Sequence, residues 1–370
     1  MENSAQRHPL IPAPDDLPTL MVALAKALAG EGPALGFGDV TSTDVPERIA
    51  VVTTTTGSTA KPKEVGLSGS ALLSSARASH AYLGADFGQV WSLLLPLTHI
   101  AGVNVLVRSL ELGTMPLDLR DSSGHKGHAK QKKLYAKADF TAIVPTQLFR
   151  ALHGEIELLE HLKNCEAVLV GGAALAQPLA ASAKAAGINL VATYGMSETS
   201  GGCVYDGQPL SGVEVKIIDG AIAVKGSTLA TSYINEEKVW EESMKDGWFV
   251  SSDHGSFVNG RLEVLGRADD VIVSGGEKIS LNAIEEIFKA HLGGVEFAAF
   301  AIPDQEWGST LHVAIASNTL ISDAEISSLL VQTFGDVAKP KGIHRIPELP
   351  LIGIGKIDRD ALVQLVRKGH

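Results

Sequence analysis

Cysteine is scarce in this chain, because Cys165 and Cys203 are the only two cysteines among 370 residues. Two cysteines cannot build a disulfide framework or a zinc site by themselves, so we expect two reduced, small apolar residues. Positive charge is also short: 31 Lys and Arg against 42 Asp and Glu give a net charge of −11. An acidic chain is poorly suited to bind phosphate backbones, and we expect no nucleic-acid partner.

Long apolar runs are missing too. The apolar stretch Leu17–Ala29 is interrupted by Pro18 and Lys26, and the residues before it show no basic-then-apolar signal pattern. No run approaches the ~20 apolar residues that a membrane-spanning helix needs. We therefore expect a cytoplasmic protein without membrane insertion; its oligomeric state is left open, with a homodimer as one alternative.

The residues that are present form an ordinary globular composition, with 45% apolar, 20% charged and 5% aromatic residues. Short β-rich runs alternate with Ala- and Leu-rich stretches, which is typical of an α/β sheet. The expected strands are Ile49–Thr53, Val90–Leu95, Ala142–Val144, Ala167–Val170 and Asn189–Thr193. The expected helices are Gly69–Leu83, Ile100–Leu112, Ala129–Lys137, Gln147–Lys163 and Gln177–Ala186.

The pattern changes twice towards the C-terminus. From Gly212, short strands with Asp-Gly and Asn-Gly pairs predict an antiparallel β subdomain. After Gly266 a strand, a glycine turn and an amphipathic helix follow, and Ser322-x-x-Glu325 fits a capping box. We predict an N-terminal domain over residues 1–266 and a small C-terminal α+β domain over 267–370. The basic run SSGHKGHAKQKK is interpreted as a solvated loop and exposed helix start.

The segment TTTTGSTAKPKEV, Thr53–Val65, places hydroxyls, a glycine and two lysines after a predicted strand. Backbone N–H groups and hydroxyls of such a loop can surround phosphates. It is not a Walker loop, because Pro62 and Glu64 flank Lys63 where that motif needs glycine and Ser or Thr. Taken alone, a phosphate loop and a polar surface loop are equally good interpretations.

This segment resembles the T-[ST]-G-[ST]-T-G-x-P-K signature of the adenylate-forming enzymes, which include acyl- and aryl-CoA ligases, nonribosomal adenylation domains and luciferases. Ala60 stands where that family usually has glycine. Further matches follow in the family's order: PLTHIAG ending at Gly102, VGGAAL from Val170, ATYGMSETS from Ala192, GWFVSSDHG from Gly247, GRADDVIVSGGEKI from Gly266 and GIGKIDRDAL from Gly353. The resemblance therefore covers nearly the whole chain.

The resemblance implies a large N-terminal domain of mixed or parallel sheets with a β subdomain, a mobile C-terminal domain, and the co-substrates ATP and CoA with Mg²⁺. It implies catalytic roles for Lys356, Glu198 and His99, with Glu198 as the Mg²⁺ ligand. The implied ATP and AMP site comprises Thr55, Thr56, Gly57, Ser58, Thr59, Lys63, Gly171, Gly172, Ala173, Tyr194, Gly195, Ser197, Asp253 and Arg267. Asp269 is the implied hinge, and Gly275 and Gly276 line the implied CoA channel.

These roles agree with the chemistry, because cations and hydroxyl donors stabilise the charge that develops on phosphate in adenylation. Outside the motif context, each residue also has a simpler interpretation. Lys356 would be a surface lysine, Glu198 a helix N-terminal carboxylate, Asp253 a turn cap, Arg267 part of a surface ion pair and Tyr194 a core residue.

The position of the phosphate loop near Thr53 is early for this family, and the resemblance is strongest to the compact, N-terminally shortened form of the o-succinylbenzoate–CoA ligases of menaquinone biosynthesis. HIAGVNVLVRSL places Arg108 where that group carries an arginine for the substrate's second carboxylate, with His99 and Gly195 beside the acid. A guanidinium can neutralise such a carboxylate with bidentate geometry, although a surface helix residue is the alternative for Arg108. Another aryl- or acyl-CoA ligase, a stand-alone enzyme loading a carrier protein and an inactive nucleotide-binding relative remain open.

Overall fold

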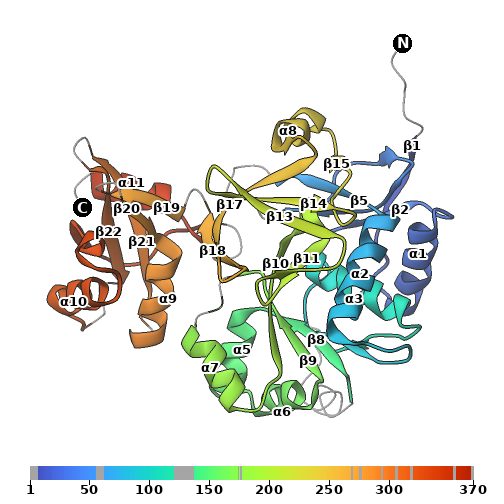
Figure 1. The fold of residues 1–370 in the computed structure, drawn as a ribbon, viewed down its shortest axis with the longest axis horizontal. Coiled ribbons are helices and arrows are strands. Elements are labelled where there is room, and N and C mark those ends of the chain that lie inside the picture. The colour runs from blue at the N-terminus through green and yellow to red at the C-terminus, as the bar shows by residue number, and fades with distance from the viewer. Residues whose placement is uncertain are drawn as a thin grey trace. The chain divides into compact units, whose positions relative to one another are not determined.

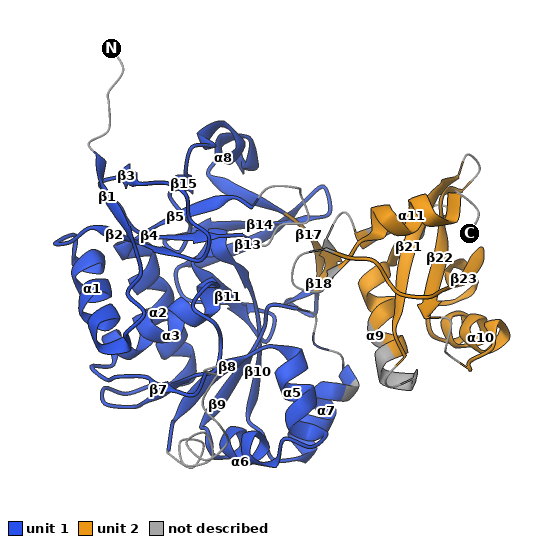
Figure 2. Cartoon of the chain, turned by 180° about the vertical axis from the view of Figure 1, so that it is seen from behind, with its two compact units in different colours: residues 1–251, 257–263 blue, residues 252–256, 264–370 orange. Residues whose placement is uncertain are grey.

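The structure is a computed structural model, and it describes residues 7–55, 62–120, 137–173, 175, 177–267, 270–274, 277–292, 295–304, 307–316, 320–352 and 356–367. The chain forms two compact units (Figure 2): unit 1 is Met1–Ser251 with Phe257–Glu263, and unit 2 is Ser252–Ser256 with Val264–His370. The expected domain boundary between residues 266 and 267 stays a prediction.

The first sheet of unit 1 has the strand order β15-β5-β4-β2-β1-β3. Its strands are β1 (Arg7–Pro12), β2 (Ala34–Phe37), β3 (Asp44–Pro46), β4 (Ile49–Thr54), β5 (Glu64–Ser68) and β15 (Ser232–Tyr233). The central strands β1, β2 and β4 are parallel, whereas β3, β5 and β15 pair antiparallel. β2 is buried at every position, as expected for a strand covered on both faces.

The second sheet of unit 1 has the order β12-β11-β10-β9-β8-β6-β7. Its strands are β6 (Trp91–Leu93), β7 (Leu117–Asp118), β8 (Phe140–Ile143), β9 (Ala167–Val170), β10 (Leu190–Met196), β11 (Gly201–Tyr205) and β12 (Gln208–Pro209). β7, β6, β8, β9 and β10 are parallel, and β11 turns back antiparallel to β10. The predicted α/β architecture is confirmed here, with β9 at its expected bounds.

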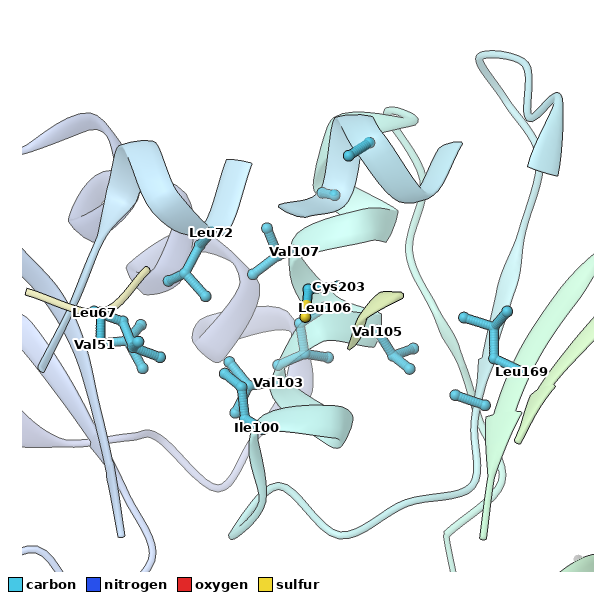
Figure 3. Close-up of a cluster of buried hydrophobic side chains, with 14 of the residues drawn as sticks. Val51, Leu67, Leu72, Ile100, Val103, Val105, Leu106, Val107, Leu169 and Cys203 are labelled. Carbon is cyan, nitrogen blue, oxygen red and sulfur yellow. The ribbon is translucent and has the colours of Figure 1, made fainter. Parts of the chain in front are cut away.

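The helices α1 (Leu17–Ala29), α2 (Gly69–Leu83) and α3 (Ile100–Glu111) pack with these sheets (Figure 1). Side chains of α3 lie between Val51, Leu67 and Leu72 on one side and Leu169 on the other (Figure 3). The helix is therefore buried almost all round. Because a closely packed helix has little freedom to shift, α3 fixes the position of the residues at its N-terminal end.

One expected helix is wrong. Gln147–Lys163 is two helices, α5 (Pro145–Leu152) and α6 (Ile156–Asn164). Gly154 lies between them with φ 141°, a conformation that favours glycine and ends the helix. α7 (Gln177–Ala185) follows near its expected bounds. The expected helix Ala129–Lys137 and the basic run lie outside the described residues, except for Lys137.

The antiparallel β subdomain is confirmed. It contains β13 (Val213–Ile218), β14 (Ala221–Gly226), β16 (Met244–Lys245), β17 (Trp248–Val258) and β18 (Arg261–Arg267), with α8 (Glu237–Ser243) beside it. The turns at Asp219-Gly220, Asp246-Gly247 and Asn259-Gly260 have positive φ at both residues. That conformation suits tight hairpins and explains the Asp-Gly and Asn-Gly pairs.

Unit 2 has a sheet of order β20-β19-β22-β21, with β23 pairing β22. The strands of this sheet are β19 (Val271–Ser274), β20 (Glu277–Ser280), β21 (Phe297–Asp304), β22 (Gly308–Ala316) and β23 (Gly342–Ile346). β24 (Leu351–Ile352) and β25 (Lys356–Ile357) pair with each other in a separate two-stranded sheet of unit 2. The helices of unit 2 are α9 (Leu281–Leu292), α10 (Asp323–Phe334) and α11 (Arg359–Arg367). The predicted capping box of Ser322 and Glu325 starts α10. No described helix, in either unit, is long and apolar enough to cross a membrane.

Candidate active site

The phosphate-loop segment is the end of a β-hairpin. β4 and β5 pair antiparallel up to Thr54 and Glu64. Beyond them the Thr55 N–H donates to the Lys63 carbonyl at 2.9 Å, and the Lys63 N–H donates to Thr55 Oγ1 at 3.1 Å. Thr55 and Lys63 are therefore held together at the stem of the loop. Thr56, Gly57, Ser58 and Thr59 lie outside the described residues.

The Glu64 side chain is engaged by the segment before β3. Its carboxylate accepts hydrogen bonds from the backbone and hydroxyl groups of Thr41 and Ser42. Burial alone would raise the pKa of Glu64, but these hydrogen bonds outweigh burial and lower it. A carboxylate engaged in this way is ionised, and its four hydrogen bonds hold it on Thr41 and Ser42.

His99 is the residue immediately before α3, with extended backbone (φ −120°, ψ 144°). Gly102, three residues on, has no room for a side chain, since a Cβ there would lie 2.3 Å from the Pro96 carbonyl oxygen. The glycine of this motif thus lets the start of α3 pack against the segment that follows β6. His99 is thereby placed beyond the carboxyl end of a parallel strand, where α/β sheets bind ligands.

Glu198 lies in a short 3-10 turn, Ser197–Thr199, directly after β10. The side chain is nine-tenths buried, and its Oε1 accepts a 2.7 Å hydrogen bond from the Tyr233 hydroxyl. Tyr194 and Gly195 precede it at a bulge in the β10–β11 pairing. A Cβ at Gly195 would lie 2.0 Å from the Gly201 carbonyl oxygen, so glycine is required for the two strands to meet.

The side chains of Ser75 and Asn104, which were not predicted from the sequence, hydrogen-bond to the end of this turn. Ser200 ends the turn with φ 51°, and its carbonyl accepts from Ser75 Oγ at 3.0 Å and Asn104 Nδ2 at 2.9 Å. All three residues are buried. Asn104 could have been found from the sequence, because it is a lone amide in the apolar run GVNVLV. A buried amide side chain almost always has a hydrogen-bond partner.

The VGGAAL segment starts at Val170, the last residue of β9. A Cβ at Gly171 would lie 2.3 Å from Thr193 Oγ1, so this glycine makes room for a side chain of the neighbouring strand. Gly172 has φ 80°, which favours glycine. Ala173 is exposed next to it. The roles of Gly171, Gly172 and Ala173 in the implied ATP and AMP site stay predictions.

Arg108 lies in the last turn of α3 and is only 3% exposed. Its Nη2 donates to the Tyr205 hydroxyl at 3.0 Å, and its guanidinium lies 4.9 Å from the centre of the Trp91 ring. Its Nε has no hydrogen-bond partner among the described residues, and the group that its Nη2 contacts is a phenol rather than a carboxylate. Arg108 is therefore a buried cation rather than the surface helix residue that was the alternative.

Unit 2 carries the remaining predicted residues. Asp253 is half-buried in β17, Arg267 is the last residue of β18, and Lys356 begins β25. Asp269, Gly275 and Gly276 lie outside the described residues. The structure describes the two units separately, so it does not bring Asp253, Arg267 and Lys356 together with the residues of unit 1.

Arg359 and Asp270 are a pair that sequence reasoning missed, although both stand in the quoted motifs. Arg359 Nη1 lies 2.6 Å from Asp270 Oδ1, and its other nitrogens reach Glu285, Asn282 and the Ala299 carbonyl. This arginine therefore ties the start of α11, directly after Lys356, to the segment after Arg267.

Family comparison adds the decisive observation. The family model of the AMP-binding enzyme matches residues 7–233, and that of the AMP-binding enzyme C-terminal domain matches residues 283–356.

The chain belongs to the AMP-binding enzyme family.

This AMP-binding enzyme is 36% identical over 374 residues to a probable 2-succinylbenzoate–CoA ligase of Mycobacterium tuberculosis, covering 96% of this chain and 97% of the relative. It is 28% identical to the 2-succinylbenzoate–CoA ligase of Escherichia coli K12, covering 98% of this chain and 81% of that relative. The predicted resemblance to the adenylate-forming enzymes is thus confirmed.

Solved structures agree on the fold. The o-succinylbenzoate CoA synthetase of Bacillus subtilis in complex with its acyl-adenylate intermediate matches with a TM-score of 0.75 at 24% identity, over 92% of this chain and 80% of that one. The same synthetase in complex with ATP and magnesium ion matches with a TM-score of 0.74 at 23% identity, over 92% and 82%. The predicted fold class is confirmed.

The carboxylate of Glu198 suits the Mg²⁺ that the chemistry of this family implies. Among the described residues, no group of three or more His, Cys, Asp and Glu could hold a metal ion. Mg²⁺ is usually bound by one or two carboxylates together with substrate phosphates, rather than by a protein cage. Glu198 offers such a carboxylate, because none of the described residues hydrogen-bonds to its Oε2 while Tyr233 holds Oε1.

Proposed function

We propose that this AMP-binding enzyme is an ATP-dependent o-succinylbenzoate–CoA ligase. It joins one carboxylate of the acid to AMP with release of diphosphate, then transfers the acyl group to CoA. The observation that carries the proposal is the 36% identity, over nearly the whole length of both chains, to a relative named 2-succinylbenzoate–CoA ligase. The reaction belongs to menaquinone biosynthesis, and we place it in the cytoplasm; the oligomeric state, with a homodimer as one alternative, stays a prediction.

In the first half-reaction, the residues of unit 1 bind and orient ATP. Thr55 and Lys63, with Thr56 to Thr59 between them, surround the phosphates. Gly172, Ala173 and Tyr194 flank the adenine, and Ser197 and Glu198 face the phosphates. Glu198 would hold Mg²⁺ together with the ATP phosphates, and the bound ion would neutralise phosphate charge. Gly171 and Gly195 shape the same wall through the strand contacts described above.

Unit 2 completes this half-reaction in the proposal. Asp253 and Arg267 bind the ribose, and the Lys356 ammonium stabilises the negative charge that develops on the α-phosphate. Such charge stabilisation, aimed at the transition state, is the main catalytic tool for phosphoryl chemistry. His99 lies beside the acid, next to Gly195.

For the second half-reaction, we propose that unit 2 rotates about Asp269, so that Lys356 withdraws and Gly275 and Gly276 line the channel for the pantetheine arm of CoA. Arg359 supports this proposal, because its ion pair with Asp270 makes the lysine-bearing segment and the segment after the hinge parts of one body. A rotation then moves both together.

Arg108 supports the assignment of a dicarboxylic acid. A buried guanidinium without a carboxylate partner is costly to keep unless a ligand supplies the missing charge. The second carboxylate of o-succinylbenzoate has that charge. Arg108 lies nine residues after His99, about 13.5 Å along the helix axis at 1.5 Å per residue, so the acid has to extend along α3.

The proposal is tested by ATP–pyrophosphate exchange with a panel of acids, followed by a choice between CoA and a carrier protein as acceptor. We expect exchange to be strongest with o-succinylbenzoate and the acyl group to pass to free CoA. Comparable exchange with benzoate or fatty acids would favour another acyl- or aryl-CoA ligase. Transfer to a carrier alone would favour the stand-alone adenylation enzyme.

The role of Arg108 is tested in Arg108→Leu. We expect a loss of about 2–5 kcal/mol in kcat/KM for o-succinylbenzoate, as for truncation of one partner of a desolvated ion pair. ATP binding and turnover of a monocarboxylic aryl acid should change little. Tyr205→Phe is the control, because it removes the hydroxyl that holds Arg108 while keeping the guanidinium. Equal losses on both acids would assign Arg108 to the core instead.

A further inference from the structure

Tyr233 connects two parts of the site that lie far apart in the sequence. Its hydroxyl donates to Glu198 Oε1 at 2.7 Å, and the Lys63 ammonium lies 4.6 Å from the centre of its ring. The tyrosine is 4% exposed and lies on β15, where it pairs with Val65 of β5. One side chain therefore contacts both the lysine at the loop stem and the carboxylate of the turn after β10.

The ring of Tyr233 is held firmly. Trp240 packs edge-on against it, with ring centres 5.3 Å apart and planes at 88°. Trp240 in turn stacks on Phe249 at 5.3 Å and 19°. Aromatic pairs of these geometries are favourable beyond the area that they bury. The hydroxyl of Tyr233 thus points at Glu198 from a fixed base.

The hydroxyl and the ring of Tyr233 interact with groups of opposite charge. The Tyr233 hydroxyl is the donor in its 2.7 Å hydrogen bond, and Glu198 Oε1 is the acceptor. The negative face of the ring attracts the Lys63 ammonium. The donor end orients a carboxylate, and the ring face orients a cation.

We propose that Tyr233 is a positioning residue for Mg·ATP: its hydroxyl fixes Glu198 so that Oε2 faces the metal ion, and its ring seats the Lys63 ammonium. The proposal rests on the proposed function for the involvement of ATP. It extends that function, because Tyr233 contacts neither reacting atom and acts only through Glu198 and Lys63.

Tyr233→Phe separates the two contributions, because it keeps the ring, its packing on Trp240 and the seat of Lys63 while removing the hydroxyl. ATP binding is measured by calorimetry at graded Mg²⁺ concentrations and in EDTA, without acid or CoA. We expect the ATP dissociation constant at sub-saturating Mg²⁺ to rise about tenfold, as for loss of a charge-assisted hydrogen bond. Affinity in EDTA should match the wild type.

Tyr82→Phe is the matched control, because the Tyr82 hydroxyl also donates to a carboxylate, that of Asp206, at 2.9 Å. It should leave the Mg²⁺ dependence of ATP affinity unchanged. Because Tyr82 is 39% exposed, we expect this variant to shift the thermal midpoint less than Tyr233→Phe does. In Glu198→Gln, the further change Tyr233→Phe should add little, because both act through one carboxylate.

A folded Tyr233→Phe protein with wild-type ATP affinity at every Mg²⁺ concentration would overturn the proposal. An equal loss of affinity in EDTA would also overturn it, since that result assigns the hydroxyl to general support of the fold. If the wild type binds Mg·ATP but does not turn over o-succinylbenzoate, the proposed substrate is refuted. The role of Tyr233 is still tested, because ATP binding is measured without the acid.

Discussion

Loss of both side chains that hold the Ser200 carbonyl should cost more than the sum of the single losses. Ser75 and Asn104 both donate to this oxygen, at 3.0 and 2.9 Å, and both are at least 97% buried. In Ser75→Ala or Asn104→Ala the carbonyl keeps one donor. In the double variant it loses both, inside a core that water does not reach.

The magnitudes follow from hydrogen-bond energetics. Each single variant loses one buried hydrogen bond, about 1 kcal/mol of unfolding free energy, with somewhat more for the cavity that Asn104→Ala leaves. The double variant adds the cost of a buried, unsatisfied carbonyl, about 1–3 kcal/mol. The double-mutant cycle should therefore show a coupling of at least about 1 kcal/mol.

Urea unfolding followed by tryptophan fluorescence measures this coupling. A Trp307→Phe background leaves Trp91, Trp240 and Trp248, all in unit 1, as reporters. The control cycle replaces Ser75→Ala by Ser79→Ala, because Ser79 is equally buried but bonds Tyr205 instead. Additive losses in the Ser75 and Asn104 cycle, like those expected of the control, would refute the shared role at Ser200.

Four further predictions concern unit 2. Lys356→Ala should abolish pyrophosphate exchange yet spare thioester formation from supplied acyl-adenylate, because the lysine acts in the first transition state only; equal loss of both half-reactions would contradict this. Asp253→Ala should weaken ATP binding by calorimetry ten- to a hundredfold, about 1.5–3 kcal/mol for a charge-assisted hydrogen bond, and an unchanged affinity would make the residue structural. Arg359→Lys cannot reproduce a guanidinium that makes four contacts, so we expect the thermal midpoint of unit 2 to fall with a loss of about 2–4 kcal/mol. Burial, followed by the positive charges of His344 and Lys341, lowers the pKa of His312 from 6.5 to about 4, so the stability linked to this group should be present above pH 6.5 and be lost as pH falls towards 4; His312→Gln should flatten that dependence in urea titrations.

Local signals predicted the elements of the fold well. The bounds of α2 and β9 follow from apolar periodicity, and the positive-φ turns follow from Asp-Gly and Asn-Gly pairs. The break at Gly154 was missed, because a single glycine within a helical pattern does not show which φ it adopts. The two free, buried cysteines are as expected.

The site was harder to predict, because its geometry depends on contacts between distant residues. The motif placed Glu198 in the site, but its partner Tyr233 is set by the pairing of β15 with β5, which the sequence pattern does not reveal. Arg359 and Asp270 likewise meet 89 residues apart. Gly171 shows the converse: a motif glycine whose missing side chain makes room for Thr193.

The complete reaction tests the central claim most directly. The wild type is incubated with o-succinylbenzoate, ATP, Mg²⁺ and CoA, and the products are quantified by mass spectrometry beside an incubation with benzoate. We predict equal amounts of o-succinylbenzoyl-CoA and AMP, with far less thioester from benzoate. AMP without thioester, or equal thioester from benzoate, would contradict the assignment of this chain as an o-succinylbenzoate–CoA ligase.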